Sequence, residues 1–273
     1  MSFLANLPQR GVISLTGADR VGFLNGLVSN DAALAAPGRA VWAALLTPQG
    51  RYLCDFFIHA DAGALLLEAP REALAGLLAR LRRFKLRAAV ELADISEHCH
   101  VYAGWGGAAL GAGGGILSVA PDPRLPEAGL RVLSEAPLSA NATAGDYAAH
   151  RIALGLPDGP PDLEAEKTLL LEAGFDELHG IAWNKGCYMG QELTARTKYR
   201  GLVKQRLIPV LCGGEAPAPG TPVMADGVEV GRVGSHAGGM ALAMLRVDAL
   251  GKALLAGATT LRPMPPGWLR LPA

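Results

Sequence analysis

The segment from Trp183 to Arg206, WNKGCYMGQELTARTKYRGLVKQR, gathers residue types that can do chemistry: a thiol, an amide, a carboxylate and several cations, in a chain of zero formal net charge. Gly186 and Gly190 bracket Cys187. Glycine tolerates positive φ and the close approach of a ligand, so this turn can hold the thiol in place with space above it. Lys185 lies just before the turn, and a nearby cation favours thiolate over thiol. We therefore expect Cys187 to be the most acidic cysteine, with Lys185 as its catalytic partner.

Charges fall at every second position after Leu193, a spacing that predicts a β-strand with its basic groups on one face. The alternating cations are Arg196, Lys198 and Arg200. Both features also have an ordinary structural explanation. A glycine-flanked cysteine is often a small buried residue in a tight turn, and a basic strand is often a solvated sheet face. The crowding of a lysine, a thiol, an amide and a carboxylate into residues 185–192 favours the functional interpretation.

The sequence KGCYMGQELTART, residues 185–197, resembles the signature of the YgfZ-type folate-binding proteins. Those proteins carry Lys-Gly-Cys-Tyr-x-Gly-Gln-Glu, and Met189 fills the free position here. The likeness extends to LTGADRVGFLNGLVSND near the start, to Gly155–Pro157 and to the C-terminal region, so it covers nearly the whole chain. This branch belongs to the superfamily of the glycine-cleavage T-protein, an aminomethyltransferase, and has the mitochondrial iron–sulfur assembly factor among its relatives.

The order of the expected elements indicates an α+β fold. A β-hairpin, a strand, a helix and a further strand follow one another early in the chain, which is typical of a ferredoxin-like unit. After Arg206 the apolar runs become short and are separated by Gly, Pro and Asp-Gly, which predicts a small antiparallel β-barrel or sandwich. The resemblance implies a ring-like pair of ferredoxin-like units around a central cavity. We therefore expect an aminomethyltransferase-like folate-binding region of two interleaved α+β units at 1–203 and a β-barrel at 204–273.

Turn chemistry and hydrophobic periodicity place the individual elements. Thr-Pro-Gln-Gly-Arg joins two apolar runs as a hairpin turn, and Pro70 opens a helix whose leucines recur at helical spacing. The expected helices follow Asp19, follow Pro70 and span residues 144–154. The expected strands cover residues 8–15, 40–46, 52–59, 64–68, 88–92, 100–104, 207–211, 221–224, 228–235, 240–245 and 259–261, and residues 116–138 are strand-like but interrupted by prolines.

The resemblance also implies a function. Proteins of this family bind tetrahydrofolate or a derivative and support iron–sulfur enzymes, including those that modify tRNA, and the cysteine of the motif is implicated in that support. An acidic thiol can attack an electrophile, form a transient mixed disulfide or supply one ligand to a cluster. Because a cluster needs several ligands, Cys187 alone cannot hold one. We therefore expect an accessory protein whose partners are iron–sulfur assembly or client proteins.

Asp55 interrupts the apolar run LCDFFIH, where an unpaired carboxylate is costly. Its position therefore predicts a partner or a cavity. In the T-protein, an acidic residue on the equivalent strand belongs to an Asp-Asp pair that contacts folate, and here the pair is Cys54-Asp55. A folate also needs flat apolar surface for its pterin and cations for its carboxylates. The expected folate-binding residues are Asp55, Glu172, Trp183, Tyr188, Arg196 and Arg200.

Two other functions stay open at this point. A folate-dependent aminomethyl or one-carbon transferase is supported by Asp55 and opposed by the loss of the second acid. A tRNA-binding protein is supported by the basic segment and Tyr199, but the cations near it form a weak, salt-sensitive patch. The chain carries 25 basic and 25 acidic residues, so no general attraction to nucleic acid or membrane is expected.

The four cysteines are far apart and form no CxxC pair, which predicts free thiols in a reducing compartment. No apolar run reaches the ~20 residues of a membrane span, and the first residues show no secretory signal, so we expect a cytoplasmic protein. At residues 97–100, EHCH leads into a strand on which the cysteine and the two histidines face opposite sides, so no metal site is expected. Nothing indicates an obligate assembly, and we expect a monomer.

Overall fold

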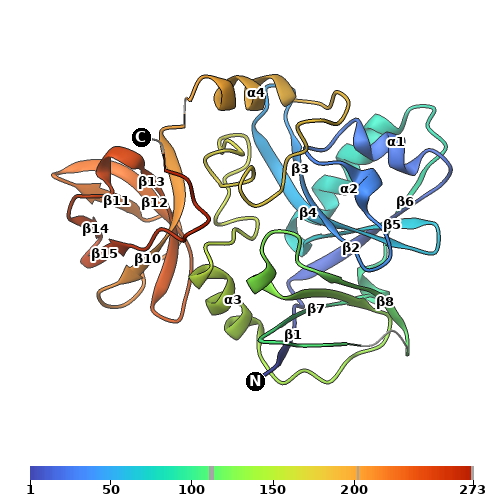
Figure 1. Ribbon diagram of the computed structural model, residues 1–273, viewed down its shortest axis with the longest axis horizontal. Helices are drawn as coiled ribbons and strands as arrows, with labels where there is room; N and C mark the ends of the chain where they lie inside the picture. Colours follow the sequence, from blue (N-terminus) through green and yellow to red (C-terminus); the bar gives the residue numbers. More distant parts are fainter. Residues whose placement is uncertain (111–113, 202, 272–273) are drawn as a thin grey trace. The chain divides into compact units, whose positions relative to one another are not determined.

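The computed structural model describes residues 1–110, 114–201 and 203–271 (Figure 1). The chain divides into two compact units. Unit 1 comprises residues 1–46, 53–144 and 179–189, and unit 2 comprises residues 47–52, 145–178 and 190–273. Each unit is therefore built from segments that are separated in the sequence. Residue 202, beside the predicted domain boundary, and residues 272–273, at the end of the predicted barrel region, lie outside the described residues.

The first sheet of unit 1 has five strands in the order β3, β4, β5, β2, β6. They are β2 (Arg10–Thr16), β3 (Val41–Leu46), β4 (Tyr52–Asp61), β5 (Ala64–Pro70) and β6 (Glu91–Asp94). Helix α2 (Arg71–Lys85) contacts β2, β5 and β6, and its buried residues Leu74, Leu77 and Leu81 share one face. The predicted hairpin and the predicted helix after Pro70 are confirmed.

The second sheet of unit 1 is antiparallel, with the order β1, β7, β9, β8. Its strands are β1 (Phe3–Asn6), β7 (His100–Trp105), β8 (Ile116–Pro121) and β9 (Leu130–Ser134).

Helix α1 (Arg20–Asn25) begins after Asp19 as predicted, but the Asp19 carboxylate accepts a hydrogen bond from the N–H of Ala89 (2.7 Å) instead of capping the helix. Short 3-10 helices are η1 (Ala32–Leu34), η2 (Ser96–His98) and η3 (Pro126–Ala128).

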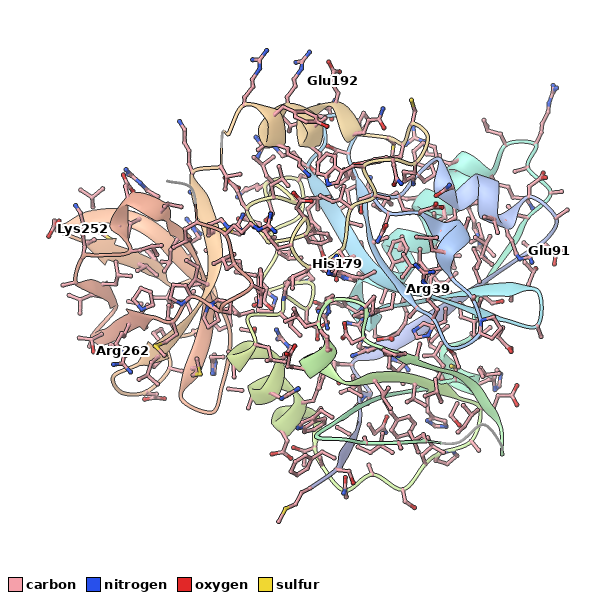
Figure 2. All side chains as sticks on the ribbon, in the orientation of Figure 1. Arg39, Glu91, His179, Glu192, Lys252 and Arg262 are labelled. Carbon is pink, nitrogen blue, oxygen red and sulfur yellow. The ribbon has the colours of Figure 1, made fainter. Side chains whose placement is uncertain are left out.

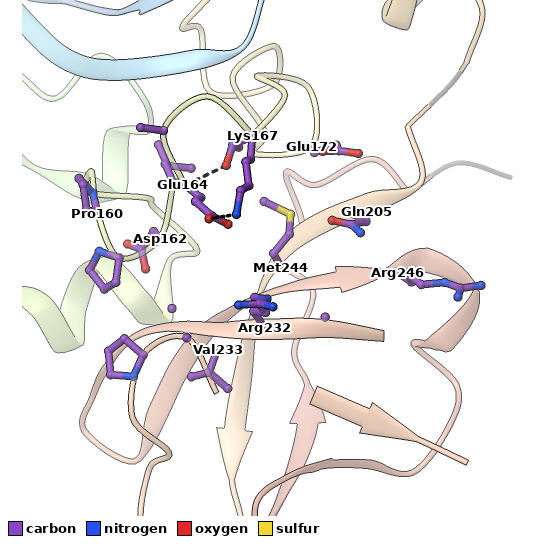
Figure 3. A pocket seen from close by; sticks show the side chains of 18 of the residues that line it. Pro160, Asp162, Glu164, Lys167, Glu172, Gln205, Arg232, Val233, Met244 and Arg246 are labelled. Atoms are coloured by element: carbon purple, nitrogen blue, oxygen red, sulfur yellow. Dashed lines mark hydrogen bonds and ion pairs between the residues drawn. The ribbon is translucent and has the colours of Figure 1, made fainter. Parts of the chain in front are cut away.

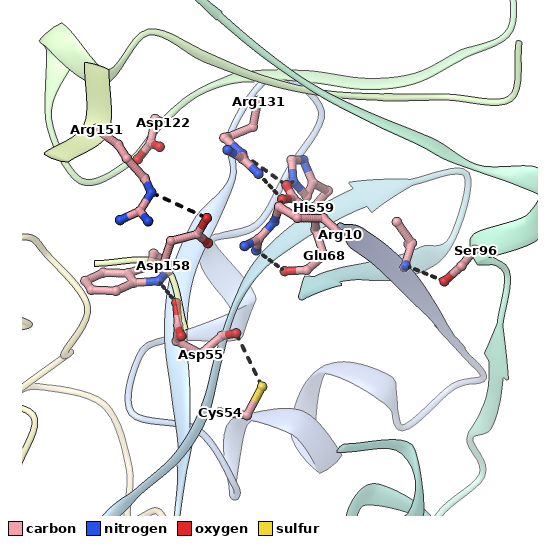
Figure 4. Close-up of polar contacts among 12 residues, drawn as sticks. Arg10, Cys54, Asp55, His59, Glu68, Ser96, Asp122, Arg131, Arg151 and Asp158 are labelled. Atoms are coloured by element: carbon pink, nitrogen blue, oxygen red, sulfur yellow. Dashed lines mark hydrogen bonds and ion pairs between the residues drawn. The ribbon is translucent and has the colours of Figure 1, made fainter. Parts of the chain in front are cut away.

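A cluster of buried charges joins the two sheets of unit 1 (Figure 4). Glu68 on β5 accepts hydrogen bonds from Arg10 on β2 and from Arg131 on β9. His59 on β4 lies 3.4 Å from Glu68 through Nε2 and 3.0 Å from Ser118 on β8 through Nδ1. The four ionisable side chains are at most 2% exposed. Because a buried charge is tolerated only when it is paired, the cluster favours one arrangement of these strands.

Unit 2 contains a closed antiparallel barrel with the strand order β10, β13, β12, β11, β14, β15. The strands are β10 (Gln205–Cys212), β11 (Pro222–Ala225), β12 (Val228–Ala237), β13 (Met240–Arg246), β14 (Leu254–Ala256) and β15 (Thr259–Pro263). The predicted barrel is confirmed, although β14 was not predicted. Closure pairs every strand on both sides and leaves no free edge.

Three further helices complete the elements of the described residues. They are α3 (Ala144–Ala153), α4 (Gln191–Tyr199) and the 3-10 helix η4 (Val247–Ala249). Helix α3 confirms the prediction for residues 144–154. Across the described part of the chain, no helix is long and apolar enough to cross a membrane.

Candidate functional site

Residues 182–189, here called the thiol loop, belong to unit 1 and are bonded to the segment that follows helix α1. The N–H of Ala182 donates to the carbonyl of Ser29 (3.0 Å), and the N–H of Met189 donates to the carbonyl of Gly26 (3.2 Å). Just before the loop, the side-chain amide of Asn30 donates to the carbonyl of His179 (2.7 Å). The loop is therefore tied to one short stretch of backbone at both of its ends.

The Lys185 ammonium lies at the centre of this arrangement. Its Nζ donates to the backbone carbonyls of Asn25 (2.7 Å), Val28 (2.7 Å) and Asn30 (2.8 Å), and it also lies 5.0 Å from the centre of the Tyr188 ring. An ammonium has three N–H donors, so the carbonyls use all of them. Burial lowers the pKa of Lys185 from 10.5 to about 8, while the nearby charge of Asp31 acts in the opposite direction.

Cys187 is exposed, whereas its neighbour Tyr188 is buried and Met189 packs against the hydrophobic core of unit 1. The other cysteines are less accessible: Cys54 and Cys99 are buried, and Cys212 is half-buried. Burial raises the pKa of each of these three thiols, to about 11 for Cys99. The thiol loop thus presents one sulfur to solvent while its next two side chains anchor it.

The basic segment after the loop is a helix, so the prediction of a β-strand is wrong. Helix α4 starts after Gly190, whose φ of 83° suits glycine. Glu192 and Arg196 form an ion pair one turn apart, and Glu192 projects away from the helix in Figure 2. The buried residues of α4 are Thr194 and Thr197. Alternating charges indicate a strand only when the residues between them are buried on one face of a sheet. Few residues of this segment are buried, so the same charges are equally compatible with a helix.

In the helix, the three cations of the predicted basic face do not all lie on the same side. Arg196 and Arg200 are four residues apart and lie on one side, whereas Lys198 points elsewhere and pairs with Asp176 (3.0 Å). Arg196 and Arg200 are exposed, and both belong to unit 2.

Asp55 has the buried partner that its position predicts. It lies on β4, is 1% exposed, and accepts a hydrogen bond from the indole N–H of Trp42 on β3 (2.9 Å; Figure 4). The Arg124 guanidinium lies 5.4 Å from the Trp42 ring and forms a two-pronged ion pair with Asp122. Trp42 is not among the residues that the sequence pattern predicts for this site. The signal was a single tryptophan on the strand that forms the hairpin with the strand of Asp55.

The predicted folate-binding residues are divided between the two units. Asp55, Trp183 and Tyr188 belong to unit 1, and Trp183 is half-buried in the thiol loop. Glu172 belongs to unit 2 with Arg196 and Arg200.

Glu172 lines a cavity of about 680 Å³ in unit 2, between residues 160–172 and strands β12 and β13 (Figure 3). Most charges on its wall are paired, as in Lys167–Glu164 and Arg232–Glu229. Burial raises the pKa of Glu172, while Leu169, Arg51 and Arg206 act in the opposite direction. The wall includes no other residue of the predicted folate set.

Glu172→Gln is expected to stabilise the protein at pH 7, by less than about 1 kcal/mol because Glu172 keeps contact with water. The raised pKa means that the native state binds this proton more tightly than the unfolded chain, so ionised Glu172 costs stability once the pH exceeds its ordinary value of 4.5. Urea unfolding at pH 4 and pH 7 tests this. The increase in the free energy of unfolding caused by Glu172→Gln should be smaller at pH 4 than at pH 7. The exposed control Glu215→Gln should cause no increase at either pH.

Comparison with known structures establishes the class of fold. The chain matches the glycine cleavage system aminomethyltransferase T from Bartonella henselae with a TM-score of 0.75 at 15% identity, covering 98% of this chain and 86% of that one. Residues 204–271 match the family model described as "CAF17, C-terminal beta-barrel domain". The protein therefore has an aminomethyltransferase-like α+β fold followed by a closed six-stranded barrel, as predicted.

Sequence relatives define the family. The chain is 31% identical to the mouse (Mus musculus) protein named iron-sulfur cluster assembly factor IBA57, mitochondrial, over 89% of this chain and 77% of that protein. The human (Homo sapiens) protein of the same name is 31% identical, over 88% and 76%. The chain belongs to the IBA57 family. A homologue from Mycosarcoma maydis is 38% identical over 79% of this chain, which spans only 59% of that relative's length.

Two expectations need correction. The resemblance to the YgfZ-type proteins identified a related family, whereas the family that the relatives define is IBA57, and their names give no support to a role in tRNA modification. The prediction of a cytoplasmic protein is wrong, because these relatives are named mitochondrial. Cysteine usage indicated a reducing compartment, and that property does not single out the cytoplasm.

Proposed function

We propose that this chain is an accessory factor of mitochondrial iron–sulfur cluster assembly that presents the Cys187 thiol to a cluster shared with a partner protein. The observation that supports this most is the exposure of Cys187 on a loop that is bonded to the backbone at both ends. The names of the IBA57 relatives supply the process and the compartment. The thiol supplies one ligand, or one transient covalent bond, during transfer.

A partner is required by the number of available ligands. An iron–sulfur cluster is held mainly by several cysteine thiolates, and two of the remaining cysteines of this chain are buried. In the described ranges, no three His, Cys, Asp or Glu side chains lie close enough together to hold a metal ion. The other ligands of the shared cluster therefore come from the protein that brings or receives it.

Cys187→Ser is expected to abolish most of the support for [4Fe–4S] enzymes while leaving the fold unchanged, because an exposed thiol contributes little to packing. The measurement is the activity of those enzymes in cells whose own factor is replaced by this chain. Cys212→Ser is the matched control, since Cys212 is the other cysteine that is not fully buried. Full enzyme activity with Cys187→Ser at normal protein levels would refute the role of the thiol.

We propose in addition that the protein binds tetrahydrofolate or a derivative. The support is the aminomethyltransferase-like fold together with Asp55, a buried carboxylate held by an indole N–H on a neighbouring strand. A carboxylate can accept hydrogen bonds from the amide edge of a pterin, and such charge-assisted bonds are strong. Trp183 and Tyr188, which belong to the same unit as Asp55, are the further proposed contacts. Glu172, Arg196 and Arg200 belong to unit 2 and stay predictions from the sequence.

Asp55→Ala is expected to weaken tetrahydrofolate binding at least about 10-fold, since a hydrogen bond to a charged group contributes about 1.5–3 kcal/mol. Calorimetric titration with tetrahydrofolate and with its 5-formyl derivative measures this. Asp61→Ala, at the end of the same strand, is the control and should bind as the parent does. Unchanged affinity in Asp55→Ala would remove Asp55 from the proposed site, and no binding to the parent would remove the folate proposal.

A further inference from the structure

The thiol loop and the end of helix α1 are joined by one side chain. Helix α1 ends at Asn25, and the carbonyls of Asn25, Val28 and Asn30 all accept hydrogen bonds from the Lys185 ammonium. The carbonyl of Asn25, the last residue of the helix, has no partner within the helix and needs a donor from elsewhere, and the carbonyls of Val28 and Asn30 lie just beyond the helix. A cation is favourable at this end because it also opposes the helix dipole.

The other contacts of the loop surround this point. The backbone bonds of Ala182 and Met189 lie on either side of Lys185 in the sequence, and the Tyr188 ring lies 5.0 Å from its Nζ. Cys187 is only two residues from the ammonium, yet no donor is left for the sulfur once the three carbonyls are satisfied. The ammonium is thus directed at the backbone of residues 25–30.

We infer that Lys185 is a positioning residue for Cys187: it clamps the thiol loop to the carbonyls of residues 25–30 and so fixes where the sulfur is presented. This inference rests on the proposed function of Cys187 and assigns Lys185 a different role from the acidification of the thiol expected from the sequence. Without the ammonium, the three carbonyls lose this donor, and the loop loses a side-chain contact that adds to its backbone bonds and to the packing of Tyr188 and Met189.

The test attaches a nitroxide spin label to Cys187 in a Cys212→Ser background, in which the other two cysteines are buried. Lys185→Met keeps an unbranched side chain only one atom shorter and removes the ammonium. We expect the label to rotate faster in this variant, with narrower spectral lines, and the amide protons of Ala182 and Met189 to exchange with solvent at least about 10-fold faster. Lys252→Met, which removes an exposed lysine of the barrel unit, is the matched control and should change neither signal.

Chemical rescue separates positioning from a general loss of structure. In Lys185→Ala, propylammonium has the size and charge of the missing atoms. Adding it should slow the rotation of the label and the exchange of the Ala182 and Met189 amide protons again. Propanol, which has a similar size but no charge, should slow them far less. An unchanged label and unchanged exchange in Lys185→Met would overturn the inference. So would full support of [4Fe–4S] enzymes by Lys185→Met when Cys187→Ser has lost it. If Cys187→Ser keeps full activity, the proposed function fails instead, and the spin-label result still decides whether Lys185 clamps the loop.

Discussion

Glu68→Gln is expected to lower the free energy of unfolding by about 3–5 kcal/mol, because it leaves two buried guanidinium groups without their carboxylate. Arg10 and Arg131 would each lose an ionised acceptor at sites that are at most 2% exposed. The total stability of a domain is roughly 5–15 kcal/mol, so the change consumes a large part of it. Urea unfolding followed by circular dichroism measures the loss, and Glu91→Gln, an exposed position in the same sheet, should change stability by less than about 0.5 kcal/mol.

A triple variant tests whether the cost comes from unpaired charge. Arg10→Met, Glu68→Leu and Arg131→Met together remove the charges and keep similar volume, and such replacements are often neutral or stabilising. We expect the triple variant to be far more stable than Glu68→Gln alone. If both lose the same stability, the packing of these side chains, including the guanidinium contacts with the Phe57 ring at 4.6 Å and 5.5 Å, is what matters.

The same cluster sets a pH dependence. Burial raises the pKa of Glu68, but Arg131 and Arg10 outweigh it and hold the pKa well below the ordinary value of 4.5. The native carboxylate therefore keeps its charge at pH values where the unfolded chain takes up a proton. Stability due to Glu68 is complete above about pH 4.5 and is lost as the pH falls below it. The parent should lose stability more steeply than the triple variant between pH 5 and pH 3.

Asp162→Asn is expected to destabilise unit 2 by about 3 kcal/mol. The Asp162 carboxylate accepts from Arg151 of helix α3 (2.8 Å), from the Ser235 N–H (2.7 Å) and hydroxyl (2.6 Å) on β12, and from the Asp158 N–H (3.1 Å). An amide in this place turns one acceptor into a donor that faces other donors. Arg151 is 6% exposed and would keep Asp158 as its nearest carboxylate, at 3.7 Å.

The control for Asp162→Asn is the same substitution in a solvent-exposed ion pair. Asp226 pairs with Lys252 on the barrel surface (2.8 Å), and both side chains are about half exposed or more. Surface pairs contribute about 0–1 kcal/mol, so Asp226→Asn should have little effect. Thermal unfolding of the two variants, compared with the parent, gives the difference. An equal decrease in the melting temperature of both variants would mean that burial does not govern the contribution of Asp162 to stability.

The parts of the fold with strong local signals could be predicted from the sequence. The barrel strands are short apolar runs between turn residues, and helix α2 shows leucines at helical spacing. Strand β1 and strand β14 were missed because they span four and three residues and depend on distant partners, such as Phe3 paired with Trp105. Helix α4 was mistaken for a strand because its exposed charges carry no signal of burial on either side.

The candidate site was predictable in its residue types and not in its contacts. The buried carboxylate of Asp55 required a partner on physical grounds, yet only the fold reveals that Trp42 supplies it. Lys185 was singled out because it stands near Cys187, whereas its contacts lie with backbone carbonyls more than 150 residues away. Backbone acceptors leave no trace in the sequence, since every residue carries a carbonyl.

The contacts of Lys185 also set the order of events during synthesis of the chain. Its partners at residues 25, 28 and 30 emerge from the ribosome long before Lys185 itself, separated by 160, 157 and 155 positions. The clamp of the thiol loop therefore cannot form until residues 179–189, the last segment of unit 1, have been made and have returned to residues 25–30. A nascent or truncated chain that stops earlier lacks both the sulfur and its support, so a correctly displayed thiol shows that the two ends of unit 1 have come together.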